Sequence, residues 1–137
     1  MVMVKTVSKL KKELDKWFSL YIRLRDATPE GLVQCFTSGR VYHYKSMHAG
    51  HFMSRKRLAT RWCEANVQPQ SPADNLFGQG EQYKFGLNLD AKYGDGAAEE
   101  LQLKSRQTLK MSRIDYEEKI SYYKMTVENL KKEKGIE

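Results

Sequence analysis

The sequence predicts a small α+β fold, and three observations support this. Apolar residues near the N-terminus recur with the period of a helix, the middle contains two short β-prone runs around a turn, and residues 97–134 contain neither proline nor glycine. A chain of 137 residues is long enough for about one domain. We therefore expect a first helix and a compact core in residues 1–96. A long C-terminal helix for dimerisation or packing should follow in residues 97–137.

The first predicted helix runs from Thr6 to about Asp26. Its apolar residues step by three or four positions, which is typical of a helix with one buried stripe. They are Leu10, Leu14, Trp17, Tyr21 and Leu24. A Thr-Pro-Glu-Gly sequence at 28–31 should end this part of the chain. The opposite face is rich in lysine and arginine, which suits either a solvated surface or contact with DNA.

The middle region lacks helical periodicity. Two β-prone runs, Leu32–Phe36 and Val41–Tyr44, flank a small polar turn that contains Gly39. This pattern predicts a β-hairpin with short strands. Residues 54–72 should then form a loop.

Two helices are expected after this loop. The first should begin near Ser71 or Asp74, because either side chain can accept the first free amide protons of a helix. The second should start after Gly80 and end at the glycine-rich sequence that follows Tyr93.

The last region predicts one helix from Ala97 to about Lys134. Its apolar seam follows a 3.5-residue repeat, which is typical of coiled-coil pairing. The seam consists of Leu109, Tyr116, Ile120, Tyr123, Val127 and Leu130. The alternative is that the same seam packs onto the N-terminal stripe of its own chain.

The charge balance indicates a polyanionic partner. The formal net charge is +7 and the isoelectric point is about 9.4, and lysine or arginine side chains that neutralise phosphates release bound counterions. The sequence has no apolar run of the roughly 18 residues that a membrane span needs, so no membrane is expected and the cytoplasm is the expected location. Two cysteines, Cys35 and Cys63, are too few for a disulfide framework.

One short segment combines a proton acceptor with positive charge. All three histidines of the chain, His43, His48 and His51, lie within it, and histidine is well suited to accept a proton near neutral pH. No acidic residue lies between Arg40 and Cys63. We expect the basic residues of this segment to contact DNA: Arg40, Lys45, Arg55, Lys56, Arg57 and Arg61. A base within a phosphate-attracting surface indicates phosphodiester chemistry, as in metal-dependent nucleases.

These residues and their spacing resemble a known family. The matching positions are His48–Phe52, Ser54–Arg55, Thr60–Trp62, Asn66–Val67, Pro69–Gln70, Asn75, Gly78, Tyr83, Leu89 and Tyr93–Gly94. They resemble the NinG/Rap recombination endonucleases of lambdoid phages, in the HNH or ββα-metal nuclease superfamily, over about residues 13–94. The resemblance implies a ββα-metal core and a metal-dependent endonuclease that cleaves branched recombination intermediates such as Holliday junctions and D-loops. For a phage-encoded protein, the cytoplasm would be that of the host.

The resemblance also implies roles for individual residues. His51 would be the general base, and Asn75 would hold Mg²⁺ or Mn²⁺ through its amide oxygen. Asn66 would fix the loop around the base. His48 would be either the second metal ligand or a phosphate contact, because Gly50 stands where many relatives have an aspartate.

The chain departs from the family at the positions of a zinc knuckle. Relatives commonly place four cysteines there, whereas this chain has Cys35, Ser38, Ser71 and Asp74. Serine is a poor zinc ligand, so no structural zinc is expected. Asp74 could instead give a carboxylate to the catalytic metal, although its knuckle position points away from it.

Cutting a two-fold junction in both strands requires two active sites. The resemblance therefore implies a homodimer, which the C-terminal seam would hold together. An alternative reading is a non-catalytic nucleic-acid-binding protein on a decayed HNH fold, since the cysteines are lost. A structural coiled-coil adaptor is a third reading, but it leaves the histidines unexplained.

Overall fold

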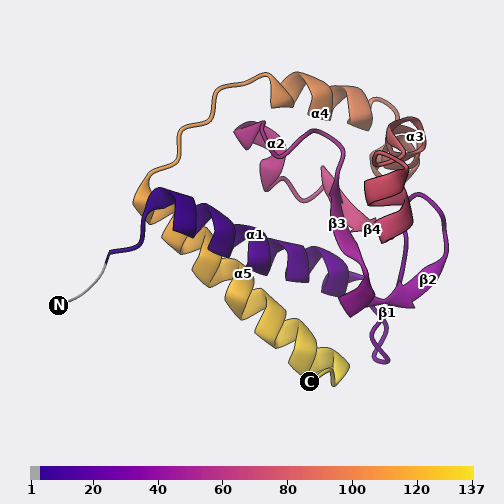
Figure 1. Ribbon diagram of the computed structural model, residues 1–137, viewed down its shortest axis with the longest axis horizontal. Helices are drawn as coiled ribbons and strands as arrows, with labels where there is room; N and C mark the ends of the chain where they lie inside the picture. The colour runs from indigo at the N-terminus through magenta and orange to yellow at the C-terminus, as the bar shows by residue number, and fades with distance from the viewer. Residues whose placement is uncertain (1–3) are drawn as a thin grey trace.

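The computed structural model describes residues 4–137 and shows a mixed α+β fold, as predicted. Its helices and strands are α1 (Val7–Arg25), β1 (Leu32–Gln34), β2 (Val41–His43), β3 (His48–His51), α2 (Leu58–Arg61), β4 (Val67–Gln70), α3 (Gln82–Tyr93), α4 (Ala97–Ser105) and α5 (Arg113–Lys134). Helices α1 and α5 lie side by side, and the β3–β4 hairpin lies between them and α3 (Figure 1). No helix within the described residues is long and apolar enough to cross a membrane.

The N-terminal helix is confirmed. It begins after Thr6, whose side chain accepts a hydrogen bond from the backbone N–H of Lys9 at 3.2 Å and so caps the helix. Its buried side chains are Leu10, Leu14, Phe18, Ile22 and Leu24. Most of this stripe faces α5 and β4.

The predicted hairpin is also confirmed, with strands shorter than the apolar runs. Strands β1 and β2 pair antiparallel, with Val33 opposite Tyr42. A 3₁₀ turn, Tyr44–Ser46, then leads into β3.

The prediction that residues 54–72 form a loop is wrong in part, because this segment contains α2 and β4. Strand β4 has the sequence Val-Gln-Pro-Gln and is buried at all four positions. It lacks the alternating pattern of a half-buried strand, and Pro69 cannot donate a ladder hydrogen bond. Tertiary pairing with β3 makes it a strand, which sequence periodicity could not predict.

The helix expected from Ser71 or Asp74 is only a π-helical turn, Ala73–Phe77. The helix expected after Gly80 is confirmed as α3, which ends at Tyr93 before Gly94. The turn and α3 together cover one face of the second hairpin.

A long C-terminal helix is present, as predicted, but it is α5 alone: residues 97–105 form the separate helix α4, and residues 106–112 lie between the two helices. A capping box starts α5: Ser112 accepts a hydrogen bond from the N–H of Asp115 at 3.2 Å, and Asp115 accepts one from the N–H of Ser112 at 2.8 Å. A Ser-x-x-Asp sequence is a helix start signal. The prediction of one helix from residue 97 missed it, because that segment contains no proline or glycine to mark a break. The break lets α4 pack on α2 and α3 while α5 packs on α1.

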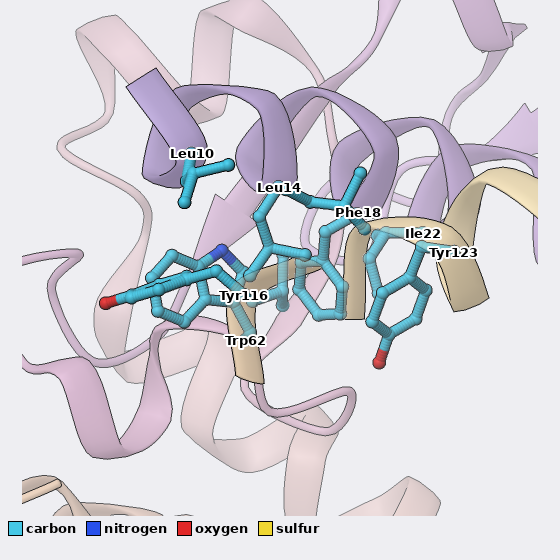
Figure 2. Close-up of a cluster of buried hydrophobic side chains, with 9 residues drawn as sticks. Leu10, Leu14, Phe18, Ile22, Trp62, Tyr116 and Tyr123 are labelled. Atoms are coloured by element: carbon cyan, nitrogen blue, oxygen red, sulfur yellow. The ribbon is translucent and has the colours of Figure 1, made fainter. Parts of the chain in front are cut away.

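The apolar seam of α5 is occupied within the chain. Tyr116, Ile120, Tyr123 and Val127 are buried, and the first three contact the buried stripe of α1 (Figure 2). Tyr123 packs edge-on against Phe18, with ring centroids 5.0 Å apart. Leu109 lies outside the helix, in the segment between α4 and α5. In the structure the seam therefore packs onto α1 of its own chain, as in the intramolecular alternative, and is not an exposed surface.

Candidate active site

The two candidate catalytic histidines lie at the two ends of β3. The antiparallel register sets His48 opposite Gln70 and His51 opposite Val67. Because side chains alternate along a strand, positions three apart lie on opposite faces. The structure therefore separates His48 and His51, and each has its own partner. His43 lies on β2 of the other hairpin.

On one face, His48 meets Asn75. The Nδ1 atom of His48 lies 3.0 Å from the amide nitrogen of Asn75. Asn75 belongs to the π-helical turn after β4, and its backbone N–H bonds to the carbonyl of Ser71 at 2.9 Å. The turn thus brings together the two residues that the sequence predicts as metal ligands.

A divalent ion at this pair would need a change in the Asn75 amide and further ligands. The 3.0 Å contact is a hydrogen-bond distance between two nitrogen atoms, whereas a ligand role for Asn75 requires its amide oxygen. A half-turn of the Asn75 amide would present its oxygen in place of its nitrogen. The described residues contain no group of three His, Cys, Asp or Glu that could hold a metal. Water and phosphate oxygens would therefore complete the coordination, as is usual for Mg²⁺.

On the other face, His51 is fixed by a backbone carbonyl. Its Nε2 lies 3.1 Å from the carbonyl oxygen of Arg61. A carbonyl only accepts, so Nε2 carries the proton and Nδ1 is left as the acceptor. Burial lowers the pKa of His51 below its ordinary value of 6.5, and the Arg61 carbonyl partly opposes this effect. His51 is therefore a neutral imidazole with an unprotonated Nδ1.

Asn66 fixes the loop that follows β3. Its side chain is buried, accepts a hydrogen bond from the N–H of Met53 at 2.8 Å and donates to the carbonyls of Met53 and Thr60 at 3.1 and 3.0 Å. These bonds join both ends of the basic loop to the start of β4.

The predicted DNA contacts fall into two groups. Five of them are exposed: Arg40, Lys45, Arg55, Lys56 and Arg57. Arg61 differs, because its guanidinium is paired with Asp15 at 2.5 Å and its side chain is only 15% exposed. The exposed run at 55–57 directly follows β3, which places positive charge close to His51 in the chain.

A cavity next to the first hairpin does not coincide with this site. It has a volume of about 720 Å³ and lies between the turn of the first hairpin and α3. Its lining includes Phe36, Lys84 and Lys92 but none of the predicted catalytic or metal residues. This cavity is therefore separate from the candidate site on the β3–β4 hairpin.

Comparison with protein families gives the decisive relationship. The model of the bacteriophage lambda NinG protein family matches residues 1–133. The chain belongs to the NinG family. Comparisons with curated proteins and with solved structures found no significant match.

In this NinG-family chain, hydrogen bonds join the residues at the four knuckle positions, Cys35, Ser38, Ser71 and Asp74. The Cys35 sulfur accepts the backbone N–H groups of Ser38 at 3.4 Å and Ser71 at 3.2 Å. Thr37 donates to the Asp74 carboxylate at 2.6 Å. Asp74 therefore binds the turn of the first hairpin rather than the His48–Asn75 pair. The network ties that hairpin to the segment that positions Asn75.

These hydrogen bonds also act on the Cys35 thiol. Burial alone would raise its pKa, but hydrogen bonds from Ser38, Ser71 and Thr37 outweigh burial and lower the pKa to about 7. These hydrogen-bond donors thus stabilise the Cys35 thiolate at a zinc-knuckle position without a metal.

We predict that the folded NinG-family protein contains no stoichiometric zinc. Cys35 is the only cysteine at the four knuckle positions, and Asp74 already accepts a hydrogen bond from Thr37. Mass-spectrometric metal analysis after purification without chelators should give far less than one zinc per chain. One tightly bound zinc per chain would contradict this prediction.

The structure explains the glycine at position 50. A Cβ atom on Gly50 would lie 2.1 Å from Oε1 of Gln70, so an aspartate does not fit there. That Oε1 is buried and has no hydrogen-bond partner among the described residues. In this NinG-family chain, the Gln70 amide occupies the space that a side chain at position 50 would need.

Sequence reasoning missed the most exposed aromatic residues. Tyr44 and Trp62, near the basic run, are buried. In contrast, Phe77 is 86% exposed and Tyr83 is 83% exposed. Phe77 follows Asn75 by two residues. Between these two aromatics, Gln79 has a positive φ of 54°, a strained backbone that is often found at functional sites.

Proposed function

We propose that this NinG-family chain is a metal-dependent, structure-specific DNA endonuclease of the HNH type. Its substrates would be branched recombination intermediates such as Holliday junctions and D-loops, with Mg²⁺ or Mn²⁺ as cofactor. The main supporting observation is the His51 imidazole, which is neutral and oriented by a carbonyl so that Nδ1 can accept a proton. Family membership supports a phage protein.

Each residue of the site would have a separate task. His51 would remove a proton from the attacking water through Nδ1. His48 and Asn75 would hold the divalent ion, which when bound stabilises charge on the scissile phosphate. The exposed run Arg55–Arg57 would bind the DNA backbone, and Asn66 would keep that loop in place.

The exposed aromatics support a substrate with unpaired bases. Aromatic side chains bind single-stranded regions by stacking, largely without regard to sequence. The exposed Phe77, two residues after Asn75, and the exposed Tyr83 would meet this need, whereas the buried Tyr44 and Trp62 would not. Branch points expose such bases more readily than a continuous duplex.

A homodimer is part of the proposal, because two symmetric cuts need two active sites. The seam of α5 is buried against α1, so pairing would use another surface. Ile114, near the start of α5, is an exposed apolar side chain that such a surface would include. Sedimentation across micromolar concentrations would measure the mass, and a strictly monomeric mass would reject the dimer.

The alternative is a non-catalytic binding protein. The separation of His48 and His51 on opposite faces of β3 favours it, because a compact catalytic centre would bring base and metal together. This alternative predicts DNA binding without cleavage under any metal condition. Incubating purified protein with labelled branched and linear DNA, with Mg²⁺ or with chelator, separates the two functions.

Replacing Asn75 with alanine should reduce cleavage in Mg²⁺ strongly, and excess Mn²⁺ should restore part of it. The variant removes one of two protein ligands from a weakly held hard ion. Initial cleavage rates as a function of metal concentration provide the measurement. The exposed Asn129 of α5 gives a matched control, since Asn129→Ala should cleave like wild type. Unchanged metal dependence in Asn75→Ala would contradict the ligand role.

Cleavage should persist as pH falls to 6.5 and decline only at lower pH. A general base works when unprotonated, and burial lowers the pKa of His51 below 6.5. Protonation, and with it loss of activity, therefore occurs on the acid side of that value. Single-turnover rates between pH 5 and pH 9 check this prediction. An acid limb with a midpoint clearly above pH 6.5 would contradict it.

A further inference from the structure

Asp15 of α1 lies at the centre of a contact between the helical pair and the loop that holds the base. Its carboxylate accepts hydrogen bonds from Nε and Nη2 of Arg61 at 3.2 and 2.5 Å. It accepts a third from Nε1 of Trp62 at 3.0 Å. The Asp15 side chain is 20% exposed and the Arg61 side chain 15%, so this is a partly buried, charge-assisted contact.

The contact fixes the end of α2 from two sides. Helix α2 has only four residues, Leu58–Arg61, and so short a helix is not stable without tertiary contacts. Asp15 holds the last helical residue, Arg61, from α1. The Trp62 ring packs edge-on against Tyr116 of α5, with centroids 5.6 Å apart. The end of α2 therefore takes its position from both long helices.

The residue that Asp15 holds is also the one that orients the base. The last carbonyls of a helix have no partner inside the helix, and the carbonyl of Arg61 instead binds Nε2 of His51 at 3.1 Å. A continuous path thus leads from the Asp15 carboxylate through the Arg61 residue to the His51 ring. A shift of Arg61 would free Nε2 and allow the proton to move to Nδ1.

We propose that Asp15 is a positioning residue for His51, which acts by holding the Arg61 carbonyl against Nε2. Its effect on the rate rests on the proposed nuclease function, whereas its effect on the His51 tautomer does not. Asp15 acts mainly through geometry, because its carboxylate is paired with Arg61; its negative charge also raises the pKa of His51, by less than burial lowers it. The other charged group that acts on His51 is Arg55 of the basic loop.

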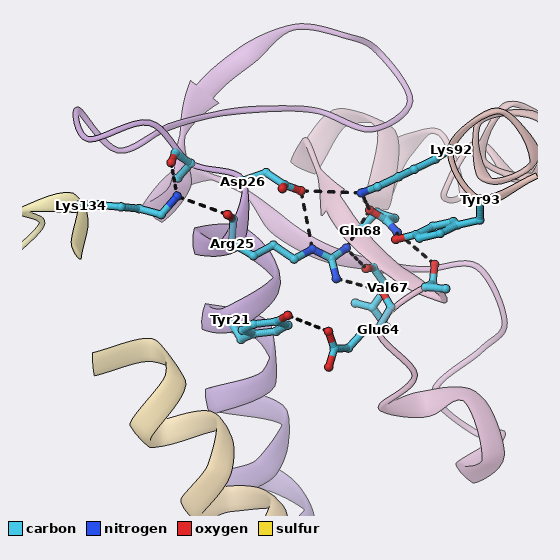
Figure 3. A network of polar contacts seen from close by, with 11 residues as sticks. Tyr21, Arg25, Asp26, Glu64, Val67, Gln68, Lys92, Tyr93 and Lys134 are labelled. Atoms are coloured by element: carbon cyan, nitrogen blue, oxygen red, sulfur yellow. Dashed lines mark hydrogen bonds and ion pairs between the residues drawn. The ribbon is translucent and has the colours of Figure 1, made fainter. Parts of the chain in front are cut away.

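The test compares two variants of Asp15 with one control. Asp15→Ala removes all three acceptor contacts, and Asp15→Asn keeps the shape and one acceptor oxygen for Trp62. Glu64 is the control, because it also joins the long helices to this part of the core. Glu64 accepts hydrogen bonds from the hydroxyl of Tyr21 at 2.7 Å (Figure 3) and from that of Tyr123 at 3.1 Å, but it does not bond to Arg61 or to the His51 ring. Glu64→Ala should therefore weaken the same helix packing without moving the base.

The first readout is the tautomer of His51, measured by ¹⁵N–¹³C NMR of the histidine ring in metal-free protein. Wild type and Glu64→Ala should show mainly the Nε2–H form. Asp15→Ala should show a mixture with the Nδ1–H form, and Asp15→Asn an intermediate state. A wild-type-like His51 spectrum in folded Asp15→Ala, or an equal change in Glu64→Ala, would overturn the proposal. Asp15→Asn provides the same comparison if the alanine variant does not fold.

The second readout is the cleavage rate at saturating DNA. A small displacement of a catalytic group costs on the order of tenfold to 100-fold in rate. Asp15→Ala should show such a loss of kcat with an unchanged Kd for DNA, and Asp15→Asn should recover part of it. A loss confined to DNA affinity would overturn the positioning role. If wild type does not cleave at all, the nuclease function fails while the tautomer readout still tests Asp15.

Discussion

Replacing His51 with alanine is expected to lower the rate of DNA cleavage by about 10²- to 10⁴-fold, the usual contribution of a general base. The affinity for DNA should change little, because the exposed basic residues remain. His51 is the histidine whose Nε2 is held by a carbonyl and whose pKa burial lowers. Its loss therefore removes the proton acceptor and leaves the positively charged surface intact.

His43 is the matched control for this experiment. It lies on β2, its ring packs against Tyr44 at 4.8 Å between centroids, and its Nδ1 accepts the N–H of Lys45 at 3.2 Å. These contacts are structural, so His43→Ala should cleave at a rate close to wild type. Wild-type cleavage by His51→Ala would refute the assignment of the base. Equal losses in both variants would point to a general effect on folding instead.

Replacing Val127 with aspartate is expected to unfold the protein or to destabilise it by roughly 3–5 kcal/mol or more. Val127 is 1% exposed, and an unpaired charge at a buried position is among the most destabilising changes known. The total stability of a domain is only about 5–15 kcal/mol. Thermal unfolding followed by circular dichroism measures the loss.

Met125→Asp places the same charge on the same helix, at a side chain that is 59% exposed. Its stability should stay within about 0.5 kcal/mol of wild type. This pair of variants distinguishes the two readings of the seam. A folded, monomeric Val127→Asp variant of a dimeric wild type would show that the seam joins two subunits rather than two helices of one chain.

The regular elements could be predicted where one physical signal dominated. The stripe that begins at Leu10 predicts α1, and the runs around Gly39 predict the first hairpin, because periodicity and turn chemistry are local. The break before α5 had a local signal as well, the Ser112 to Asp115 capping box. Strand β4 had none, because only its pairing with β3 makes it a strand.

The candidate site was predictable in its residue types and not in its geometry. The cluster of histidines and the family resemblance pointed to His51, His48 and Asn75. The contact of His48 with Asn75 and the placement of His51 on the opposite face depend on the register of a hairpin that the sequence did not reveal. The role of Asp15 could not be predicted from a local pattern, because its partners, Arg61 and Trp62, are distant in the sequence.

Cleavage of a labelled four-way junction by the purified protein tests the central proposal most directly. Reactions should contain Mg²⁺ or a chelator, with linear duplex as the competing substrate and His51→Ala as the inactive control. We predict Mg²⁺-dependent cuts near the branch point, little cleavage of linear duplex, and no cleavage with chelator or with the variant. Tight binding to the junction without cleavage in Mg²⁺ or Mn²⁺ would contradict the nuclease proposal and identify a DNA-binding protein.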